Sequence, residues 1–139
     1  LINTCGESGP IFVYNAAFET SRIRDLAERL PHLAQSLLAL NKRVVDLLPI
    51  AREHYYHPHQ KGSWSIKAVL PALCPDLSYA DLEGVKDGGM AMDAFIEALA
   101  PQTNAGRKKE IETQLLRYCE LDTFAMVRLW SEFSGKALS

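Results

Sequence analysis

The sequence has few cysteines, and none of them forms a recognisable pair. Its 139 residues contain Cys5, Cys74 and Cys119, an odd number without a Cys-x-x-Cys spacing. A disulfide framework and a zinc knuckle are therefore both disfavoured. Unpaired thiols are typical of a reducing compartment, so we expect a cytoplasmic protein.

Long apolar runs are also missing. No stretch approaches the length that crosses a bilayer, and no basic-then-apolar leader precedes the first predicted strand. We therefore expect a soluble chain without a membrane-spanning segment. The sequence begins with Leu1 rather than methionine, which is consistent with a fragment of a longer protein.

An excess of either charge is absent as well. The chain has fifteen Lys and Arg residues and seventeen Asp and Glu residues, which give a net charge of −2. The charge balance therefore does not by itself indicate a nucleic-acid-binding protein. A nuclease would have to hold its substrate through local charge and metal. The hydrophobic fraction of 47% suffices for a packed core, and the length predicts one domain over residues 1–139.

The first half of the chain reads as strand, helices and strand. "GPIFVYN", residues 9–15, is a β-branched and aromatic run after a turn signal and predicts a buried strand. Apolar residues then recur at helical spacing until Pro31, and a second helical stretch covers residues 33–40. "RVVDLL", residues 43–48, predicts another strand, or a strand that passes into a helix near Pro49.

The second half is mostly helical. Residues 52–65 are polar and aromatic with little periodicity and predict a loop or an irregular hairpin, where we expect binding residues. Helices are expected over residues 66–73, 88–100 and 108–133, the second after Asp87 and the third begun by Thr103 or Asn104. Two strands cannot form the sheet that so many helices would cover, so further strands are expected from outside this sequence.

Two short patterns carry side chains suited to chemistry. "RYCELDTFAMVRLW" places Tyr118 and Asp122 four residues apart, on one face of a helix. They are either the polar edge of an amphipathic helix or a phenol and a carboxylate directed at one metal-bound water. "VYNAAFE" places Asn15 at a strand end and Glu19 in the first turn of the following helix. Strand ends are where α/β proteins usually bind ligands. Alternatively, the Glu19 carboxylate only interacts favourably with the dipole of the helix N-terminus.

In combination these patterns resemble motifs two and three of the DnaQ-like 3′-to-5′ exonucleases, in their tyrosine subclass. "RVVDLLPIAR" and "GSWSIKAVLPAL" are similar to the intervening segments, so the resemblance covers residues 9–133. The segments "YNAAFE", "GSWSIKAVLPAL" and "YCELDT" also resemble an uncharacterised bacterial family of unknown function that is assigned to the same superfamily. The resemblance implies an α/β, RNase H-like architecture that is incomplete at its N-terminus and helix-rich in its C-terminal half.

The resemblance further implies phosphodiester hydrolysis with two Mg²⁺ or Mn²⁺ ions. Asp122 and Glu19 would be metal ligands, although the family usually has aspartate at the position of Glu19. Tyr118 would orient the attacking water, and Asn15 would position the substrate. The first motif of the family, Asp-x-Glu, does not occur before Val13. The nearest match, "DLE" at residues 81–83, is rejected because it comes after the second motif and follows a turn. An active enzyme is therefore expected only if an Asp-x-Glu motif lies upstream of this sequence.

Further candidates for binding single-stranded DNA or RNA lie near the predicted loop. Trp64 would stack on a base or pack in the core, Ser65 would cap a helix or contact substrate, and Lys67 would meet a phosphate or solvent. His54, His57 and His59 could bind Zn²⁺ or Ni²⁺, or simply flank a cleft.

Three functional interpretations follow. The first is a metal-dependent 3′-to-5′ exonuclease in the full-length protein. The second is a catalytically inactive nucleic-acid-binding or scaffold module, favoured by Glu19 and by the missing Asp-x-Glu. The third is a helical interaction domain in which the motif matches are accidental.

Overall fold

A computed structural model describes residues 1–136 of the chain, which divide into two compact units, the first of residues 1–58 and the second beginning at His59. The described residues are mostly helical, and their only sheet has two parallel strands. The RNase H-like α/β architecture expected from the resemblance is therefore wrong for this structure. In its described part, residues 1–136, no helix is long and apolar enough to cross a membrane.

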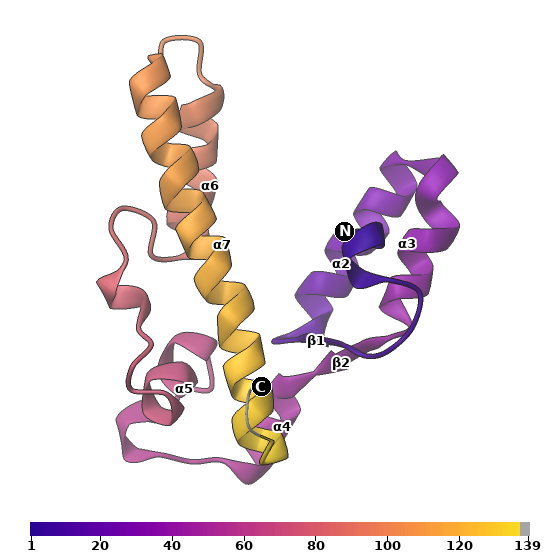
Figure 1. Cartoon of the computed structure of the whole chain (residues 1–139), viewed down its shortest axis with the longest axis vertical. Coiled ribbons are helices and arrows are strands. Elements are labelled where there is room, and N and C mark those ends of the chain that lie inside the picture. The colour runs from indigo at the N-terminus through magenta and orange to yellow at the C-terminus, as the bar shows by residue number, and fades with distance from the viewer. Residues whose placement is uncertain (137–139) are drawn as a thin grey trace. The chain divides into compact units, whose positions relative to one another are not determined.

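The first unit is built around two adjacent strands joined by helices (Figure 1). β1 pairs with β2 in parallel, with Ile11 opposite Val44 and Val13 opposite Asp46. Both strands were expected from their β-branched residues, and β2 does pass directly into a helix. The elements in order are α1 (Ile2–Cys5), β1 (Ile11–Val13), α2 (Ala16–Arg29), η1 (Pro31–Leu33), α3 (Ala34–Asn41), β2 (Val44–Asp46) and α4 (Leu47–His54).

Asp46 ties the ends of the two strands together. Its Oδ1 accepts hydrogen bonds from the backbone amides of Asn15 at 2.9 Å and Leu48 at 3.0 Å, and its Oδ2 accepts one from Ala16 at 2.8 Å. One carboxylate thus satisfies amides at the starts of both α2 and α4 that have no partner within their helices. The Asp46 side chain therefore fixes the point where both helices begin.

The core of the first unit is small. Its buried apolar side chains are Ala27, Leu37, Leu40, Leu47 and Ala51. Leu26 and Leu30, which belong to the apolar repeat of α2, remain 40% and 37% exposed. Within the apolar repeat of α2, only Ala27 is buried.

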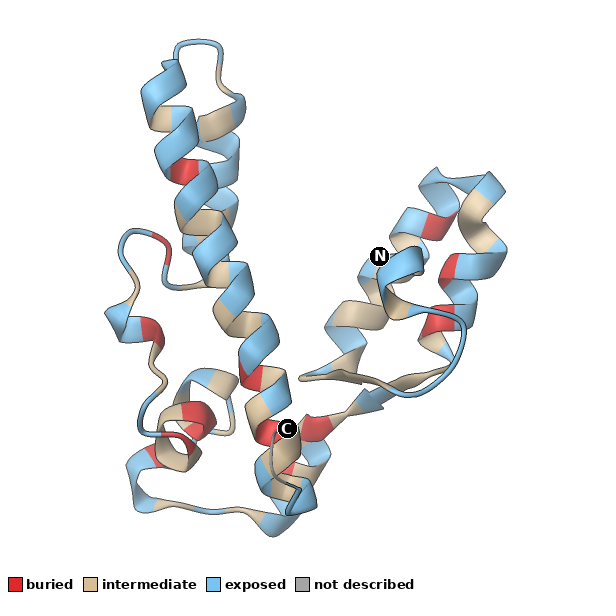
Figure 2. Ribbon diagram, viewed as in Figure 1, coloured by how far each residue is buried: buried red, intermediate tan, exposed pale blue. Residues whose placement is uncertain are grey.

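The second unit consists of helices and turns. Its elements are η2 (Pro58–Gln60), which begins at the boundary, α5 (Ile66–Leu73), η3 (Tyr79–Asp81), α6 (Gly88–Leu99) and the 30-residue α7 (Ala105–Ser134). Its buried apolar residues lie on α5, on the segment after it and on α7 (Figure 2). They are Val69, Leu70, Cys74, Tyr79, Val85, Ile111, Ala125 and Leu129.

Side-chain caps set the starts of the two long helices. Asp87 accepts a hydrogen bond from the Met90 amide, and Asn104 accepts one from the Arg107 amide, both at 2.9 Å. Both helix starts were expected from the sequence, and the structure confirms them. Because α7 begins at its cap, it starts three residues before the predicted Lys108.

Candidate functional site

Tyr118 and Asp122 lie one turn apart on α7 and are joined there by a third side chain. Tyr79, from η3, donates a hydrogen bond from its hydroxyl to Oδ1 of Asp122 at 2.5 Å. The rings of Tyr79 and Tyr118 are 6.1 Å apart between centroids, at an interplanar angle of 54°. We call Tyr79, Tyr118 and Asp122 the tyrosine-aspartate cluster.

Both phenols of the cluster stay protonated at neutral pH. Burial raises the pKa of Tyr118 to about 12, with further contributions from the charge of Asp122 and hydrogen bonding to it. Burial, the hydrogen bond to Asp122 and its charge raise the pKa of Tyr79 still further. Tyr118 is therefore a hydrogen-bonding group that can hold a water, and not a phenolate base.

Tyr79 was not among the residues predicted from the sequence. It stands 43 residues before Asp122, and a contact at that separation has no local pattern. The nearest signal is Ser78, whose hydroxyl accepts a hydrogen bond from the Ala80 amide at 3.1 Å and so fixes the turn that presents the ring.

Asn15 and Glu19 belong to the first unit, and Asp122 to the second. Asn15 precedes α2 with a left-handed backbone, φ 76°, and its amide donates to Asp46. Its side chain is exposed, while Glu19 is half-buried in the first turn of α2. The structure thus places both residues beside the carboxyl end of β1, as the sequence predicted.

The side chains do not by themselves fit a two-metal centre. Among residues 1–136 there is no group of three His, Cys, Asp or Glu side chains able to hold an ion. Such a centre needs several convergent carboxylate oxygens, whereas the tyrosine-aspartate cluster supplies one carboxylate. Asp122 and Glu19 remain single candidate ligands in separate units.

The remaining candidates occupy varied surroundings. Lys67 Nζ lies 3.9 Å from Oδ2 of Asp87, so the lysine charge is partly neutralised within the chain. Ser65 is the first residue before α5 but makes no side-chain cap, and its amide donates to Ser63 Oγ at 3.3 Å. Trp64 is half-buried.

The three histidines do not gather into a metal site within residues 1–136. His54 and His57 belong to the first unit and His59 to the second. His54 is exposed, and its Nε2 lies 3.8 Å from Oε2 of its neighbour Glu53. That single carboxylate offers too few ligands for a zinc ion.

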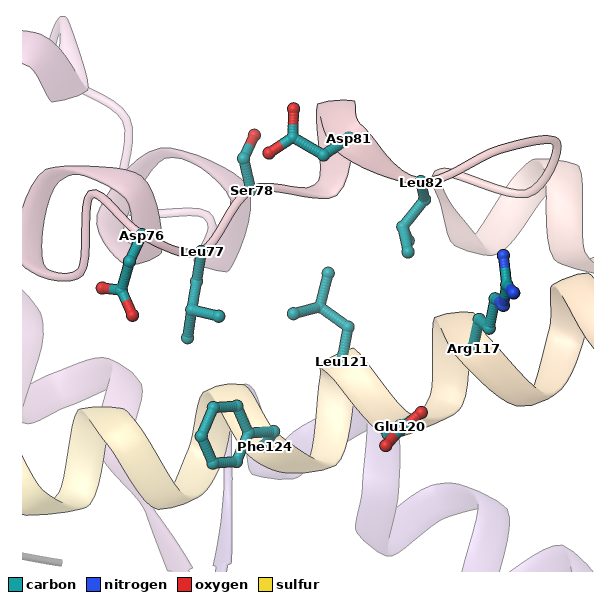
Figure 3. Close-up of a pocket in the computed structure, with 9 residues that line it drawn as sticks. All are labelled: Asp76, Leu77, Ser78, Asp81, Leu82, Arg117, Glu120, Leu121 and Phe124. Carbon is teal, nitrogen blue, oxygen red and sulfur yellow. The ribbon is translucent and has the colours of Figure 1, made fainter.

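A separate cavity of about 580 Å³ lies between α7 and the segment after α5 (Figure 3). Leu77, Leu82 and Leu121 point toward one another in it, and charged side chains stand around them. One of those, Asp76, is paired with Arg128 through hydrogen bonds of 2.7 and 3.1 Å. The full lining is Asp76, Leu77, Ser78, Asp81, Leu82, Arg117, Glu120, Leu121 and Phe124, so none of the predicted site residues lines it.

Comparison with known proteins finds one family. Residues 1–65 match the model of a domain of unknown function, DUF2779. No curated protein and no solved structure matches the chain. The match includes Asn15 and Glu19 and ends before Tyr118 and Asp122, so the first part of the chain is similar to a family whose function is not described.

Proposed function

We propose that this chain forms part of a nuclease that removes nucleotides from the 3′ end of single-stranded DNA or RNA, as its likeness to DnaQ-like exonucleases implies. The observation that carries the proposal is the tyrosine-aspartate cluster, in which a carboxylate is held beside two protonated phenols. Groups of this kind can fix the position of a water that attacks a phosphodiester.

The cluster leaves room for a further partner. A carboxylate has two oxygens with about four acceptor sites, so Asp122 can accept the hydrogen bond of Tyr79 and still bind another group. Tyr118 is half-buried, and Asp122 is not fully covered either. A water held by the Tyr118 hydroxyl would therefore lie next to the carboxylate and within reach of a substrate.

Mg²⁺ or Mn²⁺ would supply charge neutralisation at the phosphate in such an enzyme. Since residues 1–136 do not complete a two-metal centre, the proposed contribution of this chain is limited to its own side chains. In the second unit, Tyr118 and Asp122 position the reacting water, and Trp64, Ser65 and Lys67 contact the nucleic acid. In the first unit, Glu19 is a candidate metal ligand and Asn15 a candidate substrate contact, as the resemblance implies.

The test is a degradation assay on 5′-labelled single-stranded DNA and RNA, with Mn²⁺ or with EDTA, using protein expressed from the complete reading frame. We expect stepwise shortening from the 3′ end that requires Mn²⁺. Asp122→Asn should lower the rate by at least ~100-fold and Tyr118→Phe by at least ~10-fold, because positioned proton-transfer groups contribute roughly 10²–10⁴. Glu112→Gln, an exposed acid on the same helix, is the matched control.

A second candidate is a catalytically inactive module that binds nucleic acid or serves as a scaffold. The absence of a three-residue metal group within residues 1–136 favours it. In the same assay it predicts no shortening of either polymer. Retarded migration of the labelled strand that is unchanged by Asp122→Asn would then decide for a binding module over a nuclease.

A further inference from the structure

Helix α6 packs on α7 and has two apolar faces, of which the one with smaller side chains is the more buried. Ala91, Ala94 and Ala98 recur at helical spacing and are half-buried. The large side chains Met92, Phe95, Ile96 and Leu99 recur at the same spacing on another face and are 61%, 52%, 59% and 67% exposed. We call these four residues the α6 stripe.

None of the residues of α6, Gly88–Leu99, is fully buried. An alanine face lets two helices approach closely, but it covers little apolar surface. The stripe therefore remains a contiguous apolar strip after α6 has packed on α7. Spacing of i, i+3, i+4 and i+7 is the pattern by which a helix docks into an apolar partner surface.

We propose that the α6 stripe is the interface of a homodimer in which α6 packs antiparallel against α6 of a second copy. The stripe is symmetric about the midpoint between Phe95 and Ile96. A two-fold axis through that midpoint places Met92 of one copy opposite Leu99 of the other, and Phe95 opposite Ile96. The pattern is thus complementary to itself.

The exposed area fits a dimer of standard size. If each of the four side chains exposes roughly 100 Å² of apolar surface, the stripe presents roughly 400 Å². A standard interface buries about 800 Å² per partner, of which about 56–65% is apolar, or roughly 450–520 Å². The stripe supplies most of that, and its neighbours need add little.

The charges near the stripe favour a protein partner over nucleic acid. Helix α6 contains no basic residue. The Glu97 carboxylate accepts two hydrogen bonds from Arg107, at 2.7 and 3.0 Å. The carboxylate of Asp93 is exposed to solvent. An exposed carboxylate beside the stripe repels phosphates. In the antiparallel pair Asp93 lies at the rim, where solvent screens it.

The first measurement is the molar mass of the intact chain by sedimentation velocity over a wide concentration range. We expect a reversible monomer-dimer equilibrium. Phe95→Glu should raise the dimer dissociation constant by at least ~30-fold, as for a central aromatic anchor. Val127→Glu, at an exposed apolar position of α7 off the stripe, is the control that leaves it unchanged. A monomer at every concentration, or a dimer indifferent to Phe95→Glu, overturns the proposal.

A cross-linking experiment tests the direction of packing. In a Cys5→Ser, Cys119→Ser background, chains carrying Met92→Cys and chains carrying Leu99→Cys are treated with a short bismaleimide, separately and mixed. Antiparallel packing predicts cross-linked dimer in the mixture and little in either chain alone, since positions 92 of the two copies stand about 10 Å apart along the helix axis. Preferential cross-linking of Met92→Cys chains to one another contradicts the antiparallel arrangement.

Discussion

At the scale of single residues, the hydrogen bond from Tyr79 to Asp122 is both a structural tie and a feature of the candidate site. It joins η3 to α7 across 43 residues of sequence, and the ring of Tyr79 is buried, with 5% exposed. A donor lost at a charged acceptor costs more than one lost between neutral groups. The contact therefore has a measurable effect on stability, whatever reaction the cluster performs.

We expect Tyr79→Phe to lower the free energy of unfolding by about 1.5–3 kcal/mol, because it removes the hydroxyl and leaves the ring in place. Urea unfolding followed by circular dichroism measures the change. Tyr56→Phe is the control, since Tyr56 is 65% exposed and should shift the value by less than about 0.5 kcal/mol. Equal effects of the two substitutions would show that the bond to Asp122 contributes nothing.

The raised tyrosine pKa values predict a loss of stability at high pH. The unfolded chain releases the Tyr118 proton near its ordinary pKa of 10, whereas the folded chain holds it to about 12. Stability from this group is therefore complete below pH 10 and falls between about pH 10 and 12. Unfolding in urea at stepped pH should show this fall, and Tyr118→Phe should make it shallower. A slope unchanged in Tyr118→Phe would refute the assignment.

Asp46 shows how one residue can organise two elements. Asp46→Ala removes all three of its backbone hydrogen bonds, while Asp46→Asn keeps the oxygen that accepts from Asn15 and Leu48. We expect losses of about 2–3 kcal/mol for alanine and about half of that for asparagine. Chemical denaturation of both variants measures the order. If Asp46→Asn lowered the free energy of unfolding as much as Asp46→Ala, the two Asp46 oxygens would not have the separate hydrogen-bonding partners described above.

At the scale of elements, Arg43 holds the segment before β1 in place. Its guanidinium donates to the backbone carbonyls of four residues at 2.6 to 2.8 Å, namely Cys5, Gly6, Ser8 and Gly9. A planar fork of donors can serve several acceptors at once, which an ammonium on a flexible chain cannot. This clamp therefore ties the segment before β1 to the residue that precedes β2.

We expect Arg43→Lys to speed amide exchange across residues 5–11 by at least ~10-fold and to leave α7 unchanged, because lysine cannot satisfy four carbonyls. Hydrogen exchange with mass spectrometry resolves the two regions. Arg24→Lys, an exposed cation on α2, serves as the control. Unchanged exchange at residues 5–11 would mean that the clamp is dispensable.

Elements with local signals could be predicted from the sequence, and elements held by distant partners could not. The caps of α6 and α7 and the strands around Phe12 and Val45 are each announced by a few adjacent residues. The Arg43 clamp and the Tyr79 contact join residues more than thirty positions apart. Helical periodicity predicted α2 itself, but it shows an apolar face and not how much of that face is covered, so the exposure of Leu26 and Leu30 could not be read from it.

At the scale of the whole molecule, the fold class was predicted wrongly for a physical reason. The motifs around Glu19 and Asp122 describe side chains at a site, and similar side chains do not require the same sheet. Two strands of three residues each cannot support a two-layer α/β core. The helices of the second unit instead bury their apolar residues on one another and on the segment after α5.

The division into two units predicts how stability is distributed. The clamps of Asp46 and Arg43 begin and end within the first unit, and the Tyr79–Asp122 and Arg128–Asp76 contacts within the second. Each unit also has its own buried apolar residues, among them Leu40 and Leu70, which are 3% and 0% exposed. Contacts confined in this way favour separate cooperative units.

We therefore expect core substitutions to act on one unit at a time. Leu40→Ala and Leu70→Ala should each cost about 2–4 kcal/mol through lost burial and the cavity left behind. Amide exchange should quicken over residues 1–58 in the first variant and over residues 59–136 in the second. Acceleration across both ranges in either variant would mean that the chain opens as a single cooperative body, since a shared transition transmits a local loss to every amide.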